Sequence, residues 1–175
     1  LPNPLGQVPS VPRTVKSSSK PAAVASNRAG IEGGRALTSQ PRQHVTGSPL
    51  ITVAVVARNA ENSIAQTLES ILDQDYPNLE VIVLDGGSSD GTLDVLRRFD
   101  SRLDYWRSEA DKGPYDAMNK AAGIANGKYI IFMNSGDWFQ TSDALSLALM
   151  SAPHDADIVY GHHIYRTTDG FDDLH

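Results

Sequence analysis

The chain contains no cysteine, and this absence excludes two kinds of protein. Without thiols there is neither a disulfide framework nor a thiolate metal site. Long apolar runs are also missing. The longest, residues 51–57 and 129–133, fall far short of the roughly 20 residues that a membrane-spanning helix needs. The first residues lack the basic start and apolar stretch of a signal peptide, so we expect a cytoplasmic protein with at most peripheral association with the inner face of the membrane.

Residues 1–49 have few large apolar side chains. They hold seven of the 10 prolines and many Ser, Gly and Ala residues. Such a segment cannot bury enough surface to offset the entropy lost on ordering. We therefore predict a disordered leader over residues 1–49 and a single folded domain over residues 50–175, which is long enough for one core but not for two.

Charge is distributed unevenly between these two parts. Residues 1–49 carry six Lys or Arg and one acid, a net charge of +5, so the formal total of −6 leaves −11 for residues 50–175. A domain this acidic repels phosphate backbones. The charge balance therefore excludes nucleic acid as the expected partner.

From residue 50 onward, apolar strand patterns alternate with amphipathic helix patterns. Strands are predicted over residues 50–57, 80–84, 103–107, 128–133 and 158–160, with a further segment at 162–166. Helices are expected to begin near residues 62–63, 89–90, 113–114 and 142, and the third to end in a left-handed cap at Gly127. This alternation predicts an α/β fold with a mostly parallel sheet and helices on both faces.

Polar residues follow the predicted strands where each strand ends. In open α/β sheets, ligands bind outside these carboxyl ends. The residues collected there are Arg58, Asn59, Glu61, Asp85, Glu109, Asp111, Lys112, Asn134 and Asp137. Their agreement over four strand ends indicates a binding site at one edge of the sheet.

Two phosphate-binding motifs are absent from this edge. A dinucleotide site needs G-x-G-x-x-G at the first strand-to-helix turn, and residues 57–62 contain no glycine. No G-x-x-x-x-G-K-[ST] sequence occurs, which excludes a P-loop. A nucleotide-sugar site has different requirements: an acid that binds the base and another that holds a divalent metal against the diphosphate. Asp85 and Asp137 suit these roles, and oxygen ligands favour Mg²⁺ or Mn²⁺.

Two long segments carry a family resemblance. "PLITVAVVARNAENSIAQTLESILDQDYPNLEVIVLDGGSSDGT" and "SEADKGPYDAMNKAAGIANGKYIIFMNSGD", in this order, resemble the family 2 inverting glycosyltransferases with the GT-A fold. The similarity is greatest to bacterial branches that build surface polysaccharides, and it covers roughly residues 49–166. It implies the GT-A fold, apparently truncated at the C-terminus.

The resemblance also implies roles for individual residues. Asn59 and Glu61 match the motif after the first strand, whose acid faces the base and ribose, and Asp85 matches the acid that accepts from the base imide. The remaining donor-binding positions, which face the diphosphate and sugar, are Asp111, Lys112, Asp116 and Asn119.

The metal motif departs from the family pattern. Relatives commonly have Asp-x-Asp-Asp, whereas Asn134 and Gly136 replace two of these acids here and leave Asp137 as the expected metal ligand. Only 38 residues follow Asp137. The resemblance implies a catalytic base in an acceptor-binding half, and we expect this half to be missing or cut short after His175, so no catalytic residue is assigned.

The expected function is therefore metal-assisted, inverting transfer of a sugar from a nucleoside diphosphate sugar to a glycan or lipid-linked acceptor, in polysaccharide or lipid-linked glycan biosynthesis. The alternative is a truncated or degenerate module that binds the nucleotide sugar without transferring it. A nucleotidyltransferase of related topology is less consistent with the sequence, because it needs a glycine-rich triphosphate loop that residues 57–61 do not provide.

Overall fold

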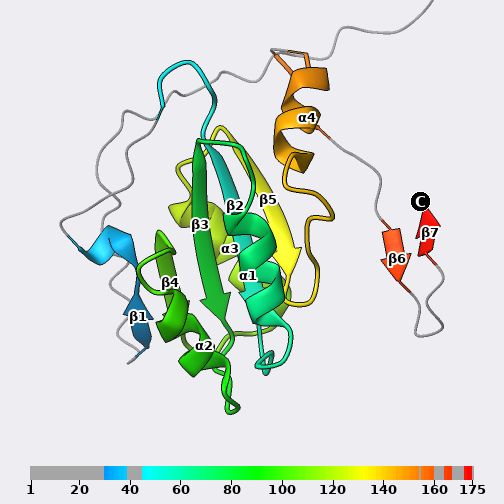
Figure 1. Cartoon of the computed structure of the whole chain (residues 1–175). Helices are drawn as coiled ribbons and strands as arrows, with labels where there is room; N and C mark the ends of the chain where they lie inside the picture. Colours follow the sequence, from blue (N-terminus) through cyan, green and yellow to red (C-terminus); the bar gives the residue numbers. More distant parts are fainter. Residues whose placement is uncertain (1–29, 39–44, 154, 160–163, 167–171, 175) are drawn as a thin grey trace, which may run out of the picture.

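The computed structural model describes residues 30–38, 45–153, 155–159, 164–166 and 172–174. Its main sheet has five strands in the order β1-β4-β3-β2-β5 (Figure 1). Their bounds are β1 Ile31–Gly33, β2 Ile51–Ala57, β3 Leu79–Asp85, β4 Tyr105–Ser108 and β5 Tyr129–Asn134. β2 is parallel to β3 and β5, and β3 is parallel to β4, whereas β1 is antiparallel to β4. The predicted mostly parallel sheet is confirmed.

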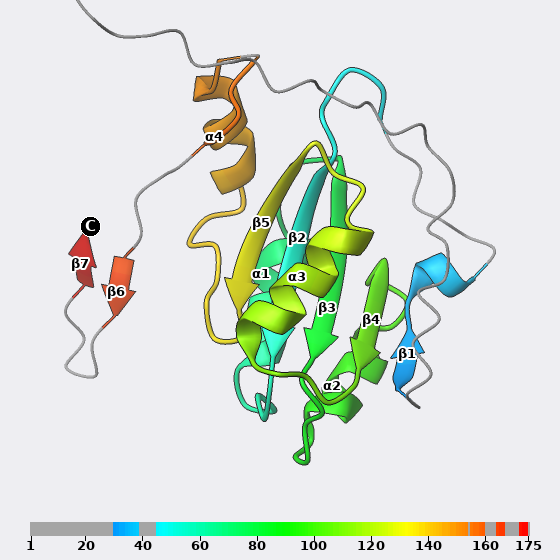
Figure 2. The same ribbon diagram turned by 180° about the vertical axis from the view of Figure 1, so that it is seen from behind.

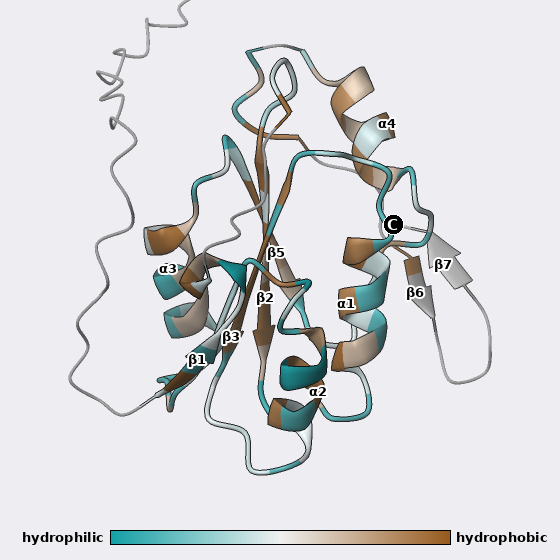
Figure 3. Ribbon diagram, turned by 60° about the vertical axis from the view of Figure 1, so that its left-hand side comes forward, coloured by the Kyte–Doolittle hydropathy of each residue, from teal (hydrophilic) through white to brown (hydrophobic). Residues whose placement is uncertain are grey.

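Helices cover both faces of this sheet, as predicted. Helices α1 and α2 lie on one face and α3 on the other (Figures 1 and 2). The helices are α1 Ile64–Leu72, α2 Thr92–Phe99, α3 Pro114–Ile124 and α4 Ala144–Ser151, with a 3-10 helix, η1, at Arg35–Leu37. The view along the sheet in Figure 3 shows the brown, apolar strands between the two helical layers.

The two central strands, β2 and β3, are buried on both faces over their whole length. Successive side chains of a strand point to opposite faces, so β2 contributes to two apolar clusters. Val53 and Val55 belong to the cluster that includes α1 and α2. Ala54 and Val56 pack in the second cluster with Ala117 of α3.

The prediction of a disordered leader was wrong for residues 30–38. In this segment, β1 pairs with the edge of β4, and the backbone N–H groups of Arg35 and Ala36 donate to the carbonyls of Leu103 and Asp104 at 2.9 and 2.8 Å. Strand addition satisfies backbone groups without requiring large apolar side chains, so a low apolar content did not prevent order. Residues 1–29 and 39–44 of the predicted leader lie outside the described residues.

Two predicted boundaries were wrong for local reasons. Helix α2 begins at Thr92 instead of residues 89–90, because Asp90 Oδ1 accepts from the backbone N–H of Thr92 at 3.1 Å and holds the preceding loop. Helix α3 ends at Ile124, before the predicted cap at Gly127. Gly127 instead lies against β2, where an added Cβ would come within 2.5 Å of the backbone nitrogen of Thr52.

The C-terminal part differs from the strand predicted over residues 158–160. Residues 158 and 159 are not in a strand, and residue 160 lies outside the described residues. Strand β6, Ile164–Arg166, pairs antiparallel with β7, Asp172–Leu174, instead of joining the main sheet. Among the described helices, none has the length and apolar character to cross a membrane.

Candidate functional site

Hydrogen bonds join the loops that follow β2 and β3. The backbone N–H of Asn59 donates to Ser88 Oγ at 2.7 Å, and Asn59 Oδ1 accepts from the backbone N–H of Ser89 at 2.9 Å. Glu61 Oε2 accepts from the backbone N–H of Gly91 at 2.7 Å. Asn59 and Glu61, both predicted donor-binding residues, therefore also hold the two loops in register at the carboxyl edge of the sheet.

Asp85 ends β3 and is almost fully buried, with 2% of its surface exposed. Its Oδ2 accepts from the backbone N–H of Ser88 at 2.9 Å and from Ser108 Oγ at 2.6 Å, and its Oδ1 accepts from Ser88 Oγ. In this structure, the predicted base-binding carboxylate connects the end of β3 to its own loop and to the end of β4.

The loop after β4 approaches the loop after β3 at Gly86. A Cβ added to Gly86 would lie 2.7 Å from Asp111 Oδ2, so a larger residue there would displace that carboxylate. The other oxygen, Asp111 Oδ1, accepts from the backbone N–H of Gly113 at 2.9 Å. The predicted residues Asp85, at the end of β3, and Asp111, in the loop after β4, therefore line the same small pocket.

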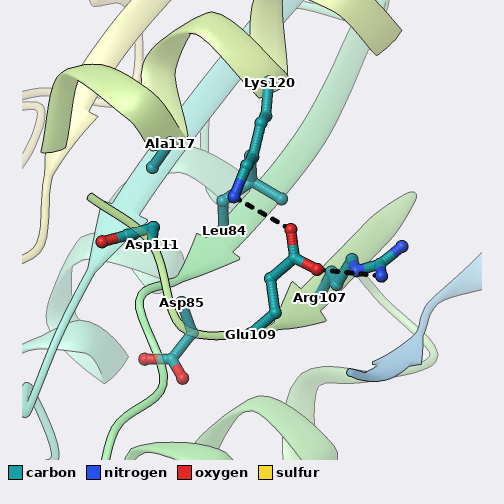
Figure 4. Close-up of a pocket in the computed structure, with 7 residues that line it drawn as sticks. All are labelled: Leu84, Asp85, Arg107, Glu109, Asp111, Ala117 and Lys120. Carbon is teal, nitrogen blue, oxygen red and sulfur yellow. Dashed lines mark ion pairs between the residues drawn. The ribbon is translucent and has the colours of Figure 1, made fainter. Parts of the chain in front are cut away.

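A series of ion pairs lies beside this pocket (Figure 4). Glu109 Oε2 is 2.9 Å from Arg107 Nη2, and Glu109 Oε1 is 3.0 Å from Lys120 Nζ. Lys120 Nζ is also 3.1 Å from Asp116 Oδ2. The pocket is lined by Leu84, Asp85, Arg107, Glu109, Asp111, Ala117 and Lys120.

These contacts change the pKa values of Asp116 and Lys120, which both lie on α3. The hydrogen bond from Lys120, followed by that from the backbone N–H of Lys112, lowers the pKa of Asp116. Burial lowers the pKa of Lys120, but its hydrogen bonds to Glu109 and Asp116 outweigh this effect and raise the pKa overall. Asp116 is therefore an ionised acceptor and Lys120 a cation at neutral pH.

Sequence reasoning placed Glu109 at a strand end without assigning it to the site, and it missed Arg107 and Lys120. The i,i+4 spacing of Asp116 and Lys120 on one helix was the signal that pointed to Lys120. No comparable pattern marked Arg107, which lies within a strand. The predicted residues Lys112 and Asn119 are both exposed, in the loop before α3 and on α3.

Asp137 is exposed in the turn that follows β5. Its Oδ2 accepts from the backbone N–H and from Nδ2 of Asn134, both at 3.2 Å. The turn is fixed by Gly136, whose φ is 105° and whose N–H donates to Thr67 Oγ1 on α1 at 2.9 Å. In β5, Asn134 pairs with Val56 of β2. Because the chain leaves β2 toward β3 on one side and reaches β5 on the other, Asp137 lies at the switch point where α/β sheets bind ligands.

The residues at this turn suit a metal ion that the protein and a bound phosphate hold together, and not one that protein ligands hold alone. Within the described ranges, no group of three or more His, Cys, Asp or Glu side chains converges to hold a metal ion. However, Mg²⁺ needs only one or two protein carboxylates when phosphate oxygens and water complete its shell. The exposed carboxylate of Asp137 has the chemistry that such a ligand requires.

The chain matches the family model described as glycosyl transferase family 2 over residues 52–175. This match covers well over half of the sequence. The chain belongs to the family 2 glycosyltransferases, and its fold is the GT-A fold of that family's solved structures, as the sequence predicted.

Curated relatives share between 31% and 38% of residues with the chain. The Escherichia coli UDP-Glc:alpha-D-GlcNAc-diphosphoundecaprenol beta-1,3-glucosyltransferase WfaP is 37% identical over 53% of this chain and 38% of its own length. The putative teichuronic acid biosynthesis glycosyltransferase TuaG of Bacillus subtilis is 38% identical over 51% of this chain and 36% of its own length. A PGL/p-HBAD biosynthesis glycosyltransferase of Mycobacterium bovis is 31% identical over 69% and 49%. The chain thus spans less than half the length of each of these relatives.

Two solved structures to which this chain is similar were determined in complex with ligands. S. aureus TarS 1–349 in complex with UDP has a TM-score of 0.52 and 28% identity, and the match covers 58% of this chain and 31% of that fragment. The mannosyltransferase PcManGT from Pyrobaculum calidifontis, in complex with GDP-Man and Mn²⁺, has a TM-score of 0.55 and 30% identity. The match covers 68% of this chain and 38% of the PcManGT chain.

Proposed function

We propose that this chain is the donor-binding part of a glycosyltransferase that transfers a sugar from a nucleoside diphosphate sugar to a glycan or lipid-linked acceptor. The observation that carries this proposal is the exposed Asp137 at the end of β5, next to the joined loops of β2 and β3. UDP and GDP-Man complexes of similar folds, and relatives that act in surface glycan biosynthesis, support it.

In this proposal, Asp137 holds Mg²⁺ or Mn²⁺ against the diphosphate. When bound, the metal neutralises charge that develops on the leaving nucleoside diphosphate. Asn134 keeps the Asp137 carboxylate oriented through two hydrogen bonds to Oδ2.

The nucleoside lies against the loops after β2 and β3. Asn59 and Glu61 fix the shape of these loops, and Asp85 provides the buried carboxylate nearest to the base. Asp111, Lys112, Asp116 and Asn119 face the diphosphate and the sugar. Transfer proceeds by in-line displacement with inversion at the anomeric carbon, and the base that deprotonates the acceptor comes from the acceptor-binding part of the protein.

The proposed location follows from the acceptor. A relative is named for a diphosphoundecaprenol substrate, which is a lipid-linked glycan. We place the chain in the cytoplasm, where nucleotide sugars are available, with peripheral contact at the inner face of the membrane. The acidic domain over residues 50–175 disfavours a nucleic acid partner.

Thermal melting with a panel of nucleotides tests the proposal. UDP, GDP, CDP and TDP are each added to the chain with and without Mn²⁺. A ligand that binds only the folded state at a hundred times its dissociation constant stabilises it by about 2.7 kcal/mol, which gives a readable shift in melting temperature. The expected result is a Mn²⁺-dependent rise with one nucleotide.

An activity assay distinguishes a glycosyltransferase from a module that only binds the nucleotide sugar. The assay uses the protein together with its acceptor-binding part, because that part supplies the base. Transfer of the matching sugar nucleotide to a lipid-linked acceptor supports the enzyme, and nucleotide binding without turnover in that complete protein favours the binding module. A cooperative melt that none of the four nucleotides moves contradicts both.

A further inference from the structure

One oxygen of Asp116 receives two hydrogen bonds. The backbone N–H of Lys112 donates to Asp116 Oδ2 at 3.2 Å, and Lys120 Nζ lies 3.1 Å from the same oxygen. Both contacts hold the carboxylate by the same oxygen, Oδ2. The side chain of Asp116 is 33% exposed, so a ligand in solution can still reach it.

Lys120 is in turn held by Glu109. Glu109 Oε1 lies 3.0 Å from Lys120 Nζ, and the Glu109 side chain is only 17% exposed. Its second oxygen lies 2.9 Å from Arg107 Nη2, whose side chain is 14% exposed. A largely buried carboxylate is costly unless it is paired. Figure 4 shows Glu109 reaching between the two cations, so each of its oxygens has a charged partner.

The far end of this series of ion pairs is attached to β1. Arg107 Nη1 lies 3.6 Å from Glu32 Oε2, which also accepts from the hydroxyl of Tyr105 at 2.7 Å. Arg107 therefore has a carboxylate on each side. Through Arg107, Glu109 is anchored to β4. This anchor leaves Glu109 and its partner Lys120 little room to move.

We propose that Glu109 is a positioning residue for the donor sugar. It fixes Lys120, and Lys120 turns Asp116 so that Oδ1 accepts a hydrogen bond from a hydroxyl of the sugar. Glu109 itself does not touch the donor. Hydrogen bonds to an ionised acceptor are stronger than neutral ones, so correct orientation of Asp116 adds affinity for the sugar but not for the nucleotide. This inference rests on the proposed function.

The test compares a nucleoside diphosphate with its sugar derivative in the same variant. Binding of UDP, UDP-glucose and UDP-GlcNAc, and of GDP and GDP-mannose, is measured by titration calorimetry with Mn²⁺. In Glu109→Gln, the shape of the side chain is kept and its charge is lost. The affinity for the preferred sugar nucleotide is expected to fall about tenfold, while that for the matching diphosphate stays within about twofold. Glu69→Gln, an exposed glutamate on α1, is the control and should change neither.

A second variant keeps the test valid if Glu109→Gln does not fold. Lys120→Met removes the cation that orients Asp116, and its side chain is 39% exposed, so folding is less at risk. It should show the same sugar-specific loss, and in this background Glu109→Gln should add little further loss.

Several outcomes overturn the inference. They are equal losses for the diphosphate and the sugar nucleotide, no loss in either variant, or a parent chain that binds none of the sugar nucleotides more tightly than their diphosphates. A parent chain that binds no nucleotide at all contradicts the proposed function itself.

Discussion

Asn59 Oδ1 accepts a hydrogen bond from the backbone N–H of Ser89 at 2.9 Å, although the two residues are 30 positions apart in the chain. Asn59 also has a φ of 51°, and among the described residues it alone combines a non-glycine side chain with positive φ. Asparagine tolerates this conformation better than most residues because its short side chain forms local hydrogen bonds. The same residue thus makes the turn after β2 and ties it to the loop after β3.

Replacing Asn59 by alanine should lower the free energy of unfolding by about 2 kcal/mol, from the lost hydrogen bond and the strain of alanine at positive φ. Asn59→Gly removes only the hydrogen bond, so it should cost about 1 kcal/mol. Urea denaturation of both variants measures the difference. Equal losses would mean that backbone strain at this position is negligible.

Asp137→Asn should reduce Mn²⁺-dependent nucleotide binding at least tenfold, because the amide is a poor metal ligand while the turn and its exposure are kept. Calorimetric titration with and without Mn²⁺ measures this loss. Asp143→Asn is the matched control, an exposed aspartate six positions along that precedes α4. If both variants bind as the parent does, Asp137 is not a metal ligand.

Two glycines in the same region of the chain should respond in opposite directions to alanine. Gly127→Ala would place a Cβ 2.5 Å from the backbone nitrogen of Thr52 and 2.6 Å from the carbonyl of Tyr129, so it should destabilise the chain by about 1–3 kcal/mol. Gly123 lies in α3 with no atom within 4 Å of an added Cβ. Gly123→Ala should therefore stabilise the chain by about 0.5–1 kcal/mol. Denaturation midpoints test both, and a neutral Gly127→Ala would show that the loop before β5 can move.

The stability of the chain should fall at high pH because of Tyr105. Burial, followed by its hydrogen bond to Glu32, raises the pKa of Tyr105 to about 12 from its ordinary value of 10.0. The folded state holds the phenol proton more tightly than the unfolded state, so this contribution is complete below pH 10 and is lost as pH rises from 10 toward 12.

Tyr105→Phe isolates this effect. Its free energy of unfolding should be lower than that of the parent at pH 9, and the gap should shrink as pH rises toward 12. Urea denaturation at several pH values measures the gap. A gap that stays constant across this range would place the hydroxyl in a site that does not favour its protonated form.

The parts of the fold that the sequence predicted are those set by local patterns. The apolar pattern over residues 50–57 predicted a strand, and β2 occupies Ile51–Ala57. Similarly, the proline after Gly113 indicated the start of α3. The ends of the elements were less predictable. At Gly127, for example, glycine is needed because the chain lies close to β2, and not because it caps the helix before it.

The sequence by itself determined the class of the protein. Its apolar periodicity predicted alternating strands and helices, the two long segments carried the resemblance to the family, and its polar residues at the strand ends predicted a ligand site at one edge of the sheet. Only the tertiary structure decided which of these residues act together. It recruited residues 30–38 to the sheet, turned Asp85 inward onto two serines, and placed Glu109 between Arg107 and Lys120. The pairing of β1 with β4, the bond from Ser108 to Asp85 and the ion pair of Glu109 with Lys120 join different elements. Such pairings depend on how the strands are ordered, which periodicity does not encode.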